Sequence, residues 1–290
     1  MTNPTLKIKN RKIGIDYEPL VIVEIGINHS GSLEVAKNMV DLAIDSGAEI
    51  IKHQTHIATD EMSKEAKSVI PSHTKESIFD IIESSQLNEK DEFDLMKYVE
   101  SKGKIFISTP FSRKAVDRLI EFDVPALKIG SGECNNLPLI EYIAKKNKPL
   151  ILSTGMNSLK SISETTKILD ANKSEYALLH CTNVYPTPPH LVRLDCLKIL
   201  SEKYPNKVVG LSDHTVSNYT SLGAIALGAS IIERHFTDSK DRVGPDIECS
   251  MDPRDLKELI EGSKVLFQAR GNDKNPVKHD IRNKFLKFNG

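Results

Sequence analysis

The chain has 290 residues, of which 39% are hydrophobic and 27% charged, so it can bury a substantial core as one large domain or two small ones. Its formal net charge of −1, with no long run of either sign, argues against nucleic acid or an anionic membrane surface as the main partner. The four cysteines show no CxxC spacing, which argues against a disulfide framework and against a cysteine-type zinc site.

The first element expected along the chain is a β-hairpin. Residues 5–18 alternate in polarity around the turn sequence KNRK. We therefore assign residues 1–19 to an N-terminal hairpin that covers one end of the domain that follows.

From residue 20 onward a single pattern repeats, in which short runs rich in Val, Ile and Leu alternate with helix-length segments of period near 3.6. The expected strands are 20–28, 49–54, 104–109, 126–130, 149–154, 176–181, 207–212 and 230–236. The expected helices are 33–46, 88–102, 112–121, 136–146, 158–170, 190–203, 216–228 and 253–269. Apolar runs without strict alternation are typical of strands buried on both faces, as in a parallel sheet.

Eight strand–helix units over residues 20–270 predict an α/β fold, a (β/α)8 TIM barrel. A doubly wound sheet is the alternative, but the GxGxxG turn typical of that fold is absent. Residues 55–87 form a long connection after the second strand, with one helix expected at 74–83, and such a connection is typical of a functional lid. Residues 271–290 are polar and without period, which indicates a linker or a disordered tail.

The location of the protein is inferred from two absences in the sequence. Residues 1–16 are polar and lack the apolar core of a signal peptide. No apolar run approaches the length of a membrane-spanning helix. We expect a cytoplasmic protein without a membrane partner.

Every expected strand ends in polar or charged residues, where a TIM barrel carries its active site. Contact with water explains many such residues, but it explains Lys52 and Lys128 less well, because they stand within apolar strand sequence. A lysine inside a barrel needs an anionic partner. Hydroxyl and amide groups are expected around these lysines. Together with the lysines they would form a ring of donors that binds phosphate and carboxylate groups. They belong to Thr109, Ser131, Ser153, Asn183 and Ser212.

Two histidines follow neighbouring strands, in the sequences LSDHT and IERHF. His214 and His235 would therefore bring two imidazoles to one place, where neutral ring nitrogens suit a divalent transition metal. Two protein ligands leave coordination positions open for water or substrate, as a Lewis-acid site requires. The alternative is that each histidine is a hydrogen-bonded structural residue.

Nine motifs in the barrel resemble those of the sialic acid synthase family, which includes N-acetylneuraminate, legionaminate and pseudaminate synthases. They cover residues 20–250 in the family's order. The motifs are EIGINHSG (24–31), IIKHQT (50–55), STPFS (108–112), KIGSGE (128–133), STGM (153–156), TNVYPTP (182–188), GLSDHT (210–215), IERHFT (232–237) and GPD (244–246).

The resemblance implies an N-acetylneuraminate synthase that condenses phosphoenolpyruvate with an open-chain N-acetylated sugar aldehyde and releases phosphate. It also implies a homodimer and a divalent metal cofactor, with Mn²⁺ as the first choice and Mg²⁺ or Co²⁺ as alternatives. Under the same resemblance, a legionaminate or pseudaminate synthase is the alternative. A synthase acting on a phosphorylated sugar, or a catalytically impaired barrel that serves as a binding partner, remains open as well.

The resemblance also assigns roles to residues, position by position. His214 and His235 would hold the metal, and Glu24 would sit beside the reacting carbon and the attacking water. Phosphoenolpyruvate would be held by Lys52, Thr109, Lys128, Ser131, Ser153, Asn183 and Ser212. The sugar would contact Gln54, Tyr185, Glu233 and Asp246. The periodicity of the strands alone would not have selected Asp246 as a site residue.

One departure from the family concerns its C-terminal antifreeze-like domain. In full-length members this domain reaches across a dimer and contributes an arginine to the partner's sugar site. The present sequence ends where that domain would begin. We therefore expect either a barrel-only form of the family or a fragment of a longer protein, with sugar binding weakened in both cases.

Overall fold

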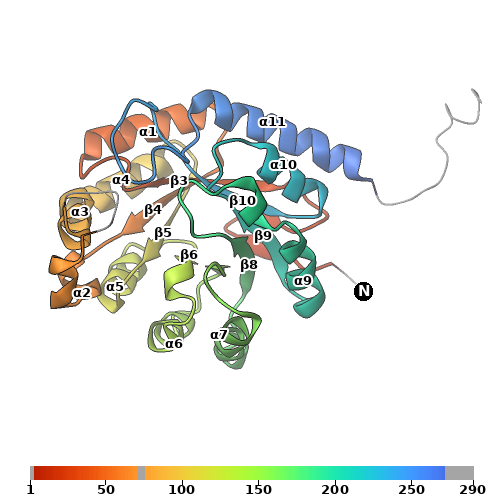
Figure 1. Ribbon diagram of the computed structural model, residues 1–290, viewed down its shortest axis with the longest axis horizontal. Coiled ribbons are helices and arrows are strands. Elements are labelled where there is room, and N and C mark those ends of the chain that lie inside the picture. Colours follow the sequence, from red (N-terminus) through yellow and green to blue (C-terminus); the bar gives the residue numbers. More distant parts are fainter. Residues whose placement is uncertain (1–2, 71–75, 272–290) are drawn as a thin grey trace, which may run out of the picture.

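Eight parallel strands close into a barrel in the computed structural model, which describes residues 3–70 and 76–271 (Figure 1). The strand order is β10-β3-β4-β5-β6-β7-β8-β9, so each strand pairs with the next in sequence and β10 pairs with β3 to complete the ring. The predicted (β/α)8 barrel is confirmed, and the doubly wound alternative is wrong.

All eight expected strands are present, with bounds close to those predicted. They are β3 (Leu20–Gly26), β4 (Ile50–Thr55), β5 (Ile105–Pro110), β6 (Leu127–Ile129), β7 (Leu150–Ser153), β8 (Tyr176–Cys181), β9 (Val208–Ser212) and β10 (Ile231–His235). The helices that cover the barrel are α1 (Leu33–Asp45), α4 (Glu89–Ser101), α5 (Arg113–Glu121), α6 (Leu137–Ala144), α7 (Leu159–Ala171), α9 (Asp195–Lys203), α10 (Tyr219–Ala226) and α11 (Pro253–Arg270). In residues 3–70 and 76–271, no helix has both the length and the apolar character needed to cross a bilayer.

The boundaries of several helices follow from local capping chemistry. Ser32, Ser112 and Ser158 each accept a hydrogen bond from the backbone N–H three residues on, which satisfies a free donor at the start of α1, α5 and α7. The helix predicted over 190–203 is instead two helices, α8 (Pro189–Val192) and α9. Arg193 separates them because its φ of 53° is left-handed and ends α8.

The predicted N-terminal hairpin is present, and it packs against the end of the barrel at which the strands begin. Strands β1 (Leu6–Ile8) and β2 (Arg11–Ile13) pair antiparallel. The buried side chains of Leu6, Ile8 and Ile13 join one cluster with the inward-facing apolar residues of the barrel. The hairpin thus keeps water out of the end of the barrel that lies opposite the candidate site.

The described part of the long connection after β4 contains three short helices, α2 (Ala58–Glu61), the 3₁₀ helix η1 (Lys64–Ser68) and α3 (Ile78–Ser85). The helix predicted at 74–83 falls partly on residues outside the described part of the chain, and the observed helix begins at Ile78. Ala58, Phe79 and Ile82 form a small buried cluster with Ile27, which fixes the connection beside the end of β3. The predicted tail at 272–290 also lies outside the described residues.

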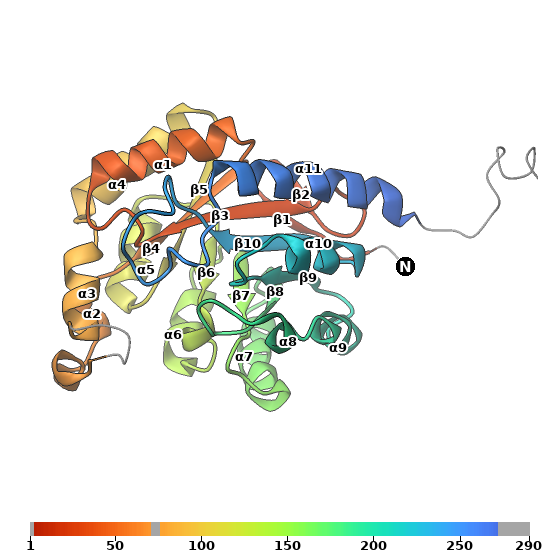
Figure 2. The same ribbon diagram turned by 45° about the horizontal axis from the view of Figure 1, so that its top comes forward.

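The inward face of the barrel changes from apolar to polar along each strand. The apolar layer includes Ile22, Ile50, Ile107, Ala126, Ile151, Leu179 and Ile231. Two residues further along the same strands, on the same face, come Glu24, Lys52, Thr109, Lys128, Ser153, Cys181 and Glu233, which line a cavity. The C-terminal mouth of the barrel is therefore polar. The loop between β10 and α11 lies over this end (Figure 2).

A single glycine inside the barrel allows close packing of β9. A Cβ atom on Gly210 would lie 2.3 Å from the backbone oxygen of Ile231 and 2.7 Å from Leu179 Cδ2. We expect Gly210→Ala to lower the free energy of unfolding by about 1–3 kcal/mol, because the neighbouring backbone cannot move aside cheaply. Urea unfolding measures this loss. Gly130→Ala is the control, since its Cβ would meet nothing closer than 3.8 Å. Equal stability of the two variants would contradict the packing argument.

Candidate active site

A cavity of about 140 Å³ opens at the C-terminal ends of the barrel strands. Of the fourteen residues predicted for the site, thirteen line this cavity: Glu24, Lys52, Gln54, Thr109, Lys128, Ser131, Ser153, Asn183, Tyr185, Ser212, His214, Glu233 and His235. The fourteenth, Asp246, comes from the loop after β10, and its Oδ2 lies 3.5 Å from Nδ1 of His235. The fold therefore brings the whole predicted set together.

Two buried lysines form one side of the cavity. The side chains of Lys52 and Lys128 are each 3% exposed. Lys52 Nζ donates to Thr109 Oγ1 at 3.2 Å, and Lys128 Nζ donates to Ser153 Oγ at 2.7 Å. Burial lowers the pKa of Lys52 to about 8, although the carboxylate of Glu233 opposes that shift. Two ammonium groups and two hydroxyls thus face the same small volume.

Two glutamates balance the charge of these lysines. Glu24 forms an ion pair with Lys52 and accepts a hydrogen bond from the backbone N–H of Gly26 at 2.6 Å. Glu233 Oε1 lies 3.6 Å from Lys52 Nζ and 3.5 Å from Lys128 Nζ. Burial raises the pKa of Glu233, but Lys128 and Lys52 outweigh burial, so the pKa is lowered and the group is ionised. The anionic partner that the sequence required for the lysines is supplied by the protein itself.

The two predicted metal ligands lie side by side, with ring centroids 5.4 Å apart. His214 Nδ1 lies 3.1 Å from the carbonyl oxygen of Thr182, so the proton sits on Nδ1 and the lone pair on Nε2. His235 Nδ1 is buried and has no hydrogen-bond partner. Burial and the neighbouring His235 lower the pKa of His214 to about 4, and burial and Lys52 lower that of His235 to about 3. Both imidazoles are therefore neutral at pH 7.

This donor set fits a divalent transition metal with two protein ligands. Within residues 3–70 and 76–271, no group of three or more His, Cys, Asp or Glu side chains is arranged to hold a metal ion. The unpartnered Nδ1 of His235 and the free Nε2 of His214 are the nitrogen donors that such an ion prefers. The remaining positions would be left to water and substrate, as in catalytic rather than structural sites.

A glycine at the end of β3 allows the approach of two site residues. The pairing of β3 with β4 shifts between Glu24 and Gly26, and Gly26 has φ of +49°. A Cβ atom there would lie 3.4 Å from His235 Nδ1 and 3.5 Å from Gln54 Nε2. Glycine adopts this left-handed conformation without strain. Gln54 and His235 are therefore close neighbours across the end of β3.

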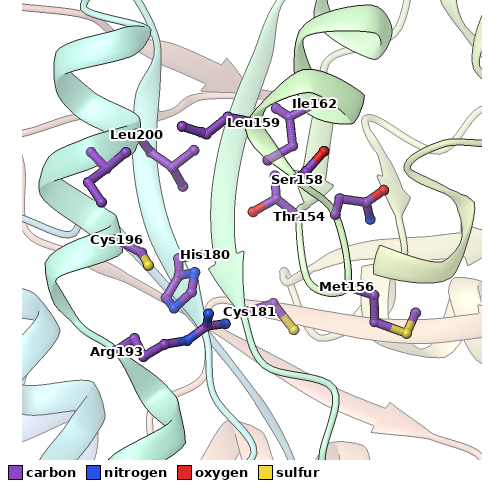
Figure 3. A pocket seen from close by; sticks show the side chains of 12 residues that line it. Thr154, Met156, Ser158, Leu159, Ile162, His180, Cys181, Arg193, Cys196 and Leu200 are labelled. Carbon is purple, nitrogen blue, oxygen red and sulfur yellow. The ribbon is translucent and has the colours of Figure 1, made fainter.

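A second, larger cavity of about 400 Å³ lies on the outside of the barrel between α7 and α9 (Figure 3). Its wall is largely apolar, with Leu159, Ile162 and Leu200 among its residues. His180 Nε2 donates to the carbonyl oxygen of Val192 at 2.6 Å. Because this cavity contains no predicted site residue and no convergent set of charges, we place the candidate active site at the barrel mouth.

Comparison with known proteins shows the family of the chain. The family model described as the NeuB family matches residues 39–275. The chain belongs to the NeuB family.

Several similar proteins are named as synthases of legionaminic acid, sialic acid or N-acetylneuraminate 9-phosphate. The chain is 39% identical over 260 residues to the N,N'-diacetyllegionaminic acid synthase of Campylobacter jejuni, covering 87% of this chain and 77% of that protein. It is 31% identical over 264 residues to the human N-acetylneuraminate-9-phosphate synthase, covering 90% of this chain and 74% of that protein. The crystal structure of N-acetylneuraminic acid (sialic acid) synthetase from Leptospira borgpetersenii matches with a TM-score of 0.90 and 28% identity, covering 98% of this chain and 96% of that one.

Sequence reasoning missed some residues that line the cavity of this NeuB-family chain. Phe111, Gly130, Gly132 and Cys181 belong to the lining but were not selected. Cys181 occupies an inward position two residues after Leu179, so strand alternation would have found it. Phe111 follows β5 as an apolar residue, and nothing in the strand pattern separates it from the core.

Proposed function

We propose that the chain is an N-acetylneuraminate synthase that condenses phosphoenolpyruvate with N-acetylmannosamine and water and releases phosphate. The observation that carries this proposal is the pair of buried lysines at the barrel mouth, placed in one small cavity with two neutral histidines. Membership of the NeuB family and similarity to sialic acid and legionaminic acid synthases support it.

In the proposed reaction, Lys52 and Lys128 hold the phosphate and carboxylate of phosphoenolpyruvate. Each charge-assisted hydrogen bond would contribute about 1.5–3 kcal/mol. The neutral groups that complete this anion site are Thr109, Ser131, Ser153, Asn183 and Ser212. Their common effect is to fix the enol carbon in one orientation toward the sugar aldehyde, which is the positioning part of catalysis.

The sugar would occupy the histidine side of the cavity, in contact with Gln54, Tyr185, Glu233 and Asp246. His214 and His235 would hold a divalent ion, which we propose to be Mn²⁺, with Mg²⁺ and Co²⁺ as alternatives. When bound, that ion would supply Lewis-acid polarisation of the aldehyde oxygen.

Glu24 would act at the second carbon of phosphoenolpyruvate. The terminal enol carbon forms the new bond to the aldehyde carbon, which leaves positive character on the carbon that carries the phosphate ester oxygen. Water adds to that carbon, and the resulting tetrahedral intermediate expels phosphate. The Glu24 carboxylate is held in the cavity by Gly26 N–H and Lys52, in a place suited to stabilising the cation or orienting the water.

A second candidate substrate is the N,N'-diacetylated sugar that leads to legionaminic acid. The observation in its favour is the higher identity to the Campylobacter jejuni synthase, 39% against 31% for the human N-acetylneuraminate-9-phosphate synthase. The chemistry at the lysines, at Glu24 and at the histidines would be the same for both sugars.

Phosphate release with different sugars tests the proposal. We expect release from phosphoenolpyruvate and Mn²⁺ only when a sugar is added, with a higher kcat/KM for N-acetylmannosamine than for the N,N'-diacetylated sugar. The reverse order would identify the chain as a legionaminic acid synthase. Release at the same rate without any sugar, or none with either sugar, would reject the condensation.

A further inference from the structure

His56 stands behind the cavity and contacts one of its lining residues. It follows β4 and is 5% exposed. Its Nε2 lies 3.0 Å from Oε1 of Gln54, and its Nδ1 lies 2.8 Å from Oε1 of Glu61. Its ring stacks on Phe111, with centroids 4.3 Å apart and planes 9° from parallel. The imidazole is therefore fixed on three sides.

Glu61 is itself held firmly in α2. Its side chain is 5% exposed, and its second oxygen accepts a hydrogen bond from the backbone N–H of Ile57 at 3.1 Å. The start of α2 is tied to the rest of the long connection by Gln86 Oε1, which accepts from Ala58 N at 3.0 Å. A chain of contacts thus runs from the connection after β4, through Glu61 and His56, to Gln54 in the cavity.

The protons on His56 determine the orientation of the Gln54 amide. Both partners of His56 are oxygens in the present geometry, and a neutral imidazole donates from only one nitrogen. If His56 carries two protons, Gln54 Oε1 accepts and the amide NH₂ faces the cavity. If His56 is neutral with its proton on Nδ1 toward Glu61, the amide must turn so that its NH₂ donates to Nε2 and its oxygen faces the cavity. In both cases the imidazole decides which end of the amide meets a ligand.

We propose that His56 and Glu61 are a positioning pair that fixes the orientation of the Gln54 amide and so selects which sugar group the cavity accepts. This inference rests on the proposed function, because it takes the sugar to lie beside Gln54. Gln54 lies next to Gly26 and His235, on the histidine side of the cavity. A buried polar group that meets a mismatched ligand is left unpaired, and such a mismatch discriminates strongly between similar substrates.

Two variants separate this role from simple support of the fold. His56→Phe keeps an aromatic ring against Phe111 but removes both hydrogen bonds, and Glu61→Gln is nearly isosteric. We expect each to raise the KM for the sugar roughly tenfold, as loss of one oriented hydrogen bond implies, with kcat and the Kd for phosphoenolpyruvate within about twofold of wild type. The double variant should match the single ones, because both act through the same amide.

Asp60→Asn is the matched control. Asp60 lies on the same short helix but pairs with Lys114, 3.4 Å away, so its replacement should leave the sugar KM unchanged. A sugar KM equal to wild type in both His56→Phe and Glu61→Gln would overturn the inference and leave the proposed function standing. A loss that falls equally on the sugar KM and on phosphoenolpyruvate binding would also overturn it, since that is the result of general disorder. Failure of the wild-type chain to release phosphate with any sugar would instead reject the proposed function and this inference with it.

Discussion

Replacing Lys128 with methionine is expected to weaken phosphoenolpyruvate binding by at least about tenfold and to lower the stability of the fold as well. The ammonium group lies 2.7 Å from Ser153 Oγ and 3.5 Å from Glu233 Oε1, and the side chain is 3% exposed. Loss of a charge-assisted contact to the ligand costs about 1.5–3 kcal/mol. Removing one partner of a buried ion pair costs about 3–5 kcal/mol of stability, because the carboxylate is left less compensated.

A second substitution separates the two effects of Lys128. The double variant Lys128→Met, Glu233→Gln lacks both the ammonium group of Lys128 and the carboxylate of Glu233. Its stability should therefore return toward that of the wild type, while its affinity for phosphoenolpyruvate stays low. Urea unfolding and isothermal titration measure these quantities independently. Lys145→Met is the control, because Lys145 pairs with Glu141 on the exposed face of α6. Unchanged affinity in Lys128→Met would make this lysine a structural residue and remove it from the proposed anion site.

The barrel was predictable because its signal is local. Each strand is a short apolar run that is buried on both faces, and each helix carries one apolar stripe. The same locality explains why site residues were predictable as a group, because the alternation along each strand places Lys52, Lys128 and Glu233 on the inner face at the polar end.

What the sequence did not reveal depends on contacts across the barrel. The spacing of Lys52, Lys128 and Glu233 in the sequence does not predict that the Glu233 carboxylate lies near both ammonium groups. The distances from this carboxylate to the two lysines depend on the stagger of the strands in the closed barrel. Glu233 was assigned to the sugar by resemblance alone. The structure adds its contact with both lysines, so an incoming phosphate would have to share them with a carboxylate already present.

The sequence did not predict the pair formed by His56 and Glu61, for a different reason. It depends on the packing of α2, in a connection without the periodicity that identifies strands and long helices. The left-handed Arg193 that divides α8 from α9 is similar, since the residue there is not glycine or asparagine, which the αL conformation favours. Local propensity therefore identifies neither feature.

Replacing His235 with alanine is expected to abolish metal-dependent turnover and to weaken Mn²⁺ binding by at least about 100-fold. Loss of a mere hydrogen-bond partner of a metal ligand costs 10–100-fold in affinity, so loss of a ligand should cost more. The described residues offer no third clustered donor to replace it. Electron paramagnetic resonance of free Mn²⁺ measures binding without reference to turnover, and His214→Ala should give the same result. His190→Ala, an exposed histidine in α8, is the control.

The same substitution should leave the fold almost as stable as before, in contrast to Lys128→Met. His235 Nδ1 makes no hydrogen bond and its ring is neutral, so alanine removes only the 3.5 Å contact between this nitrogen and Asp246 Oδ2, which is not an ion pair. A buried site residue that contributes little to the stability of the fold serves ligand binding instead. Such an exchange of stability for function is expected in an active site. Wild-type Mn²⁺ affinity in both histidine variants would exclude this pair as the metal site. A large loss of stability in His235→Ala would show instead that the imidazole supports the barrel mouth.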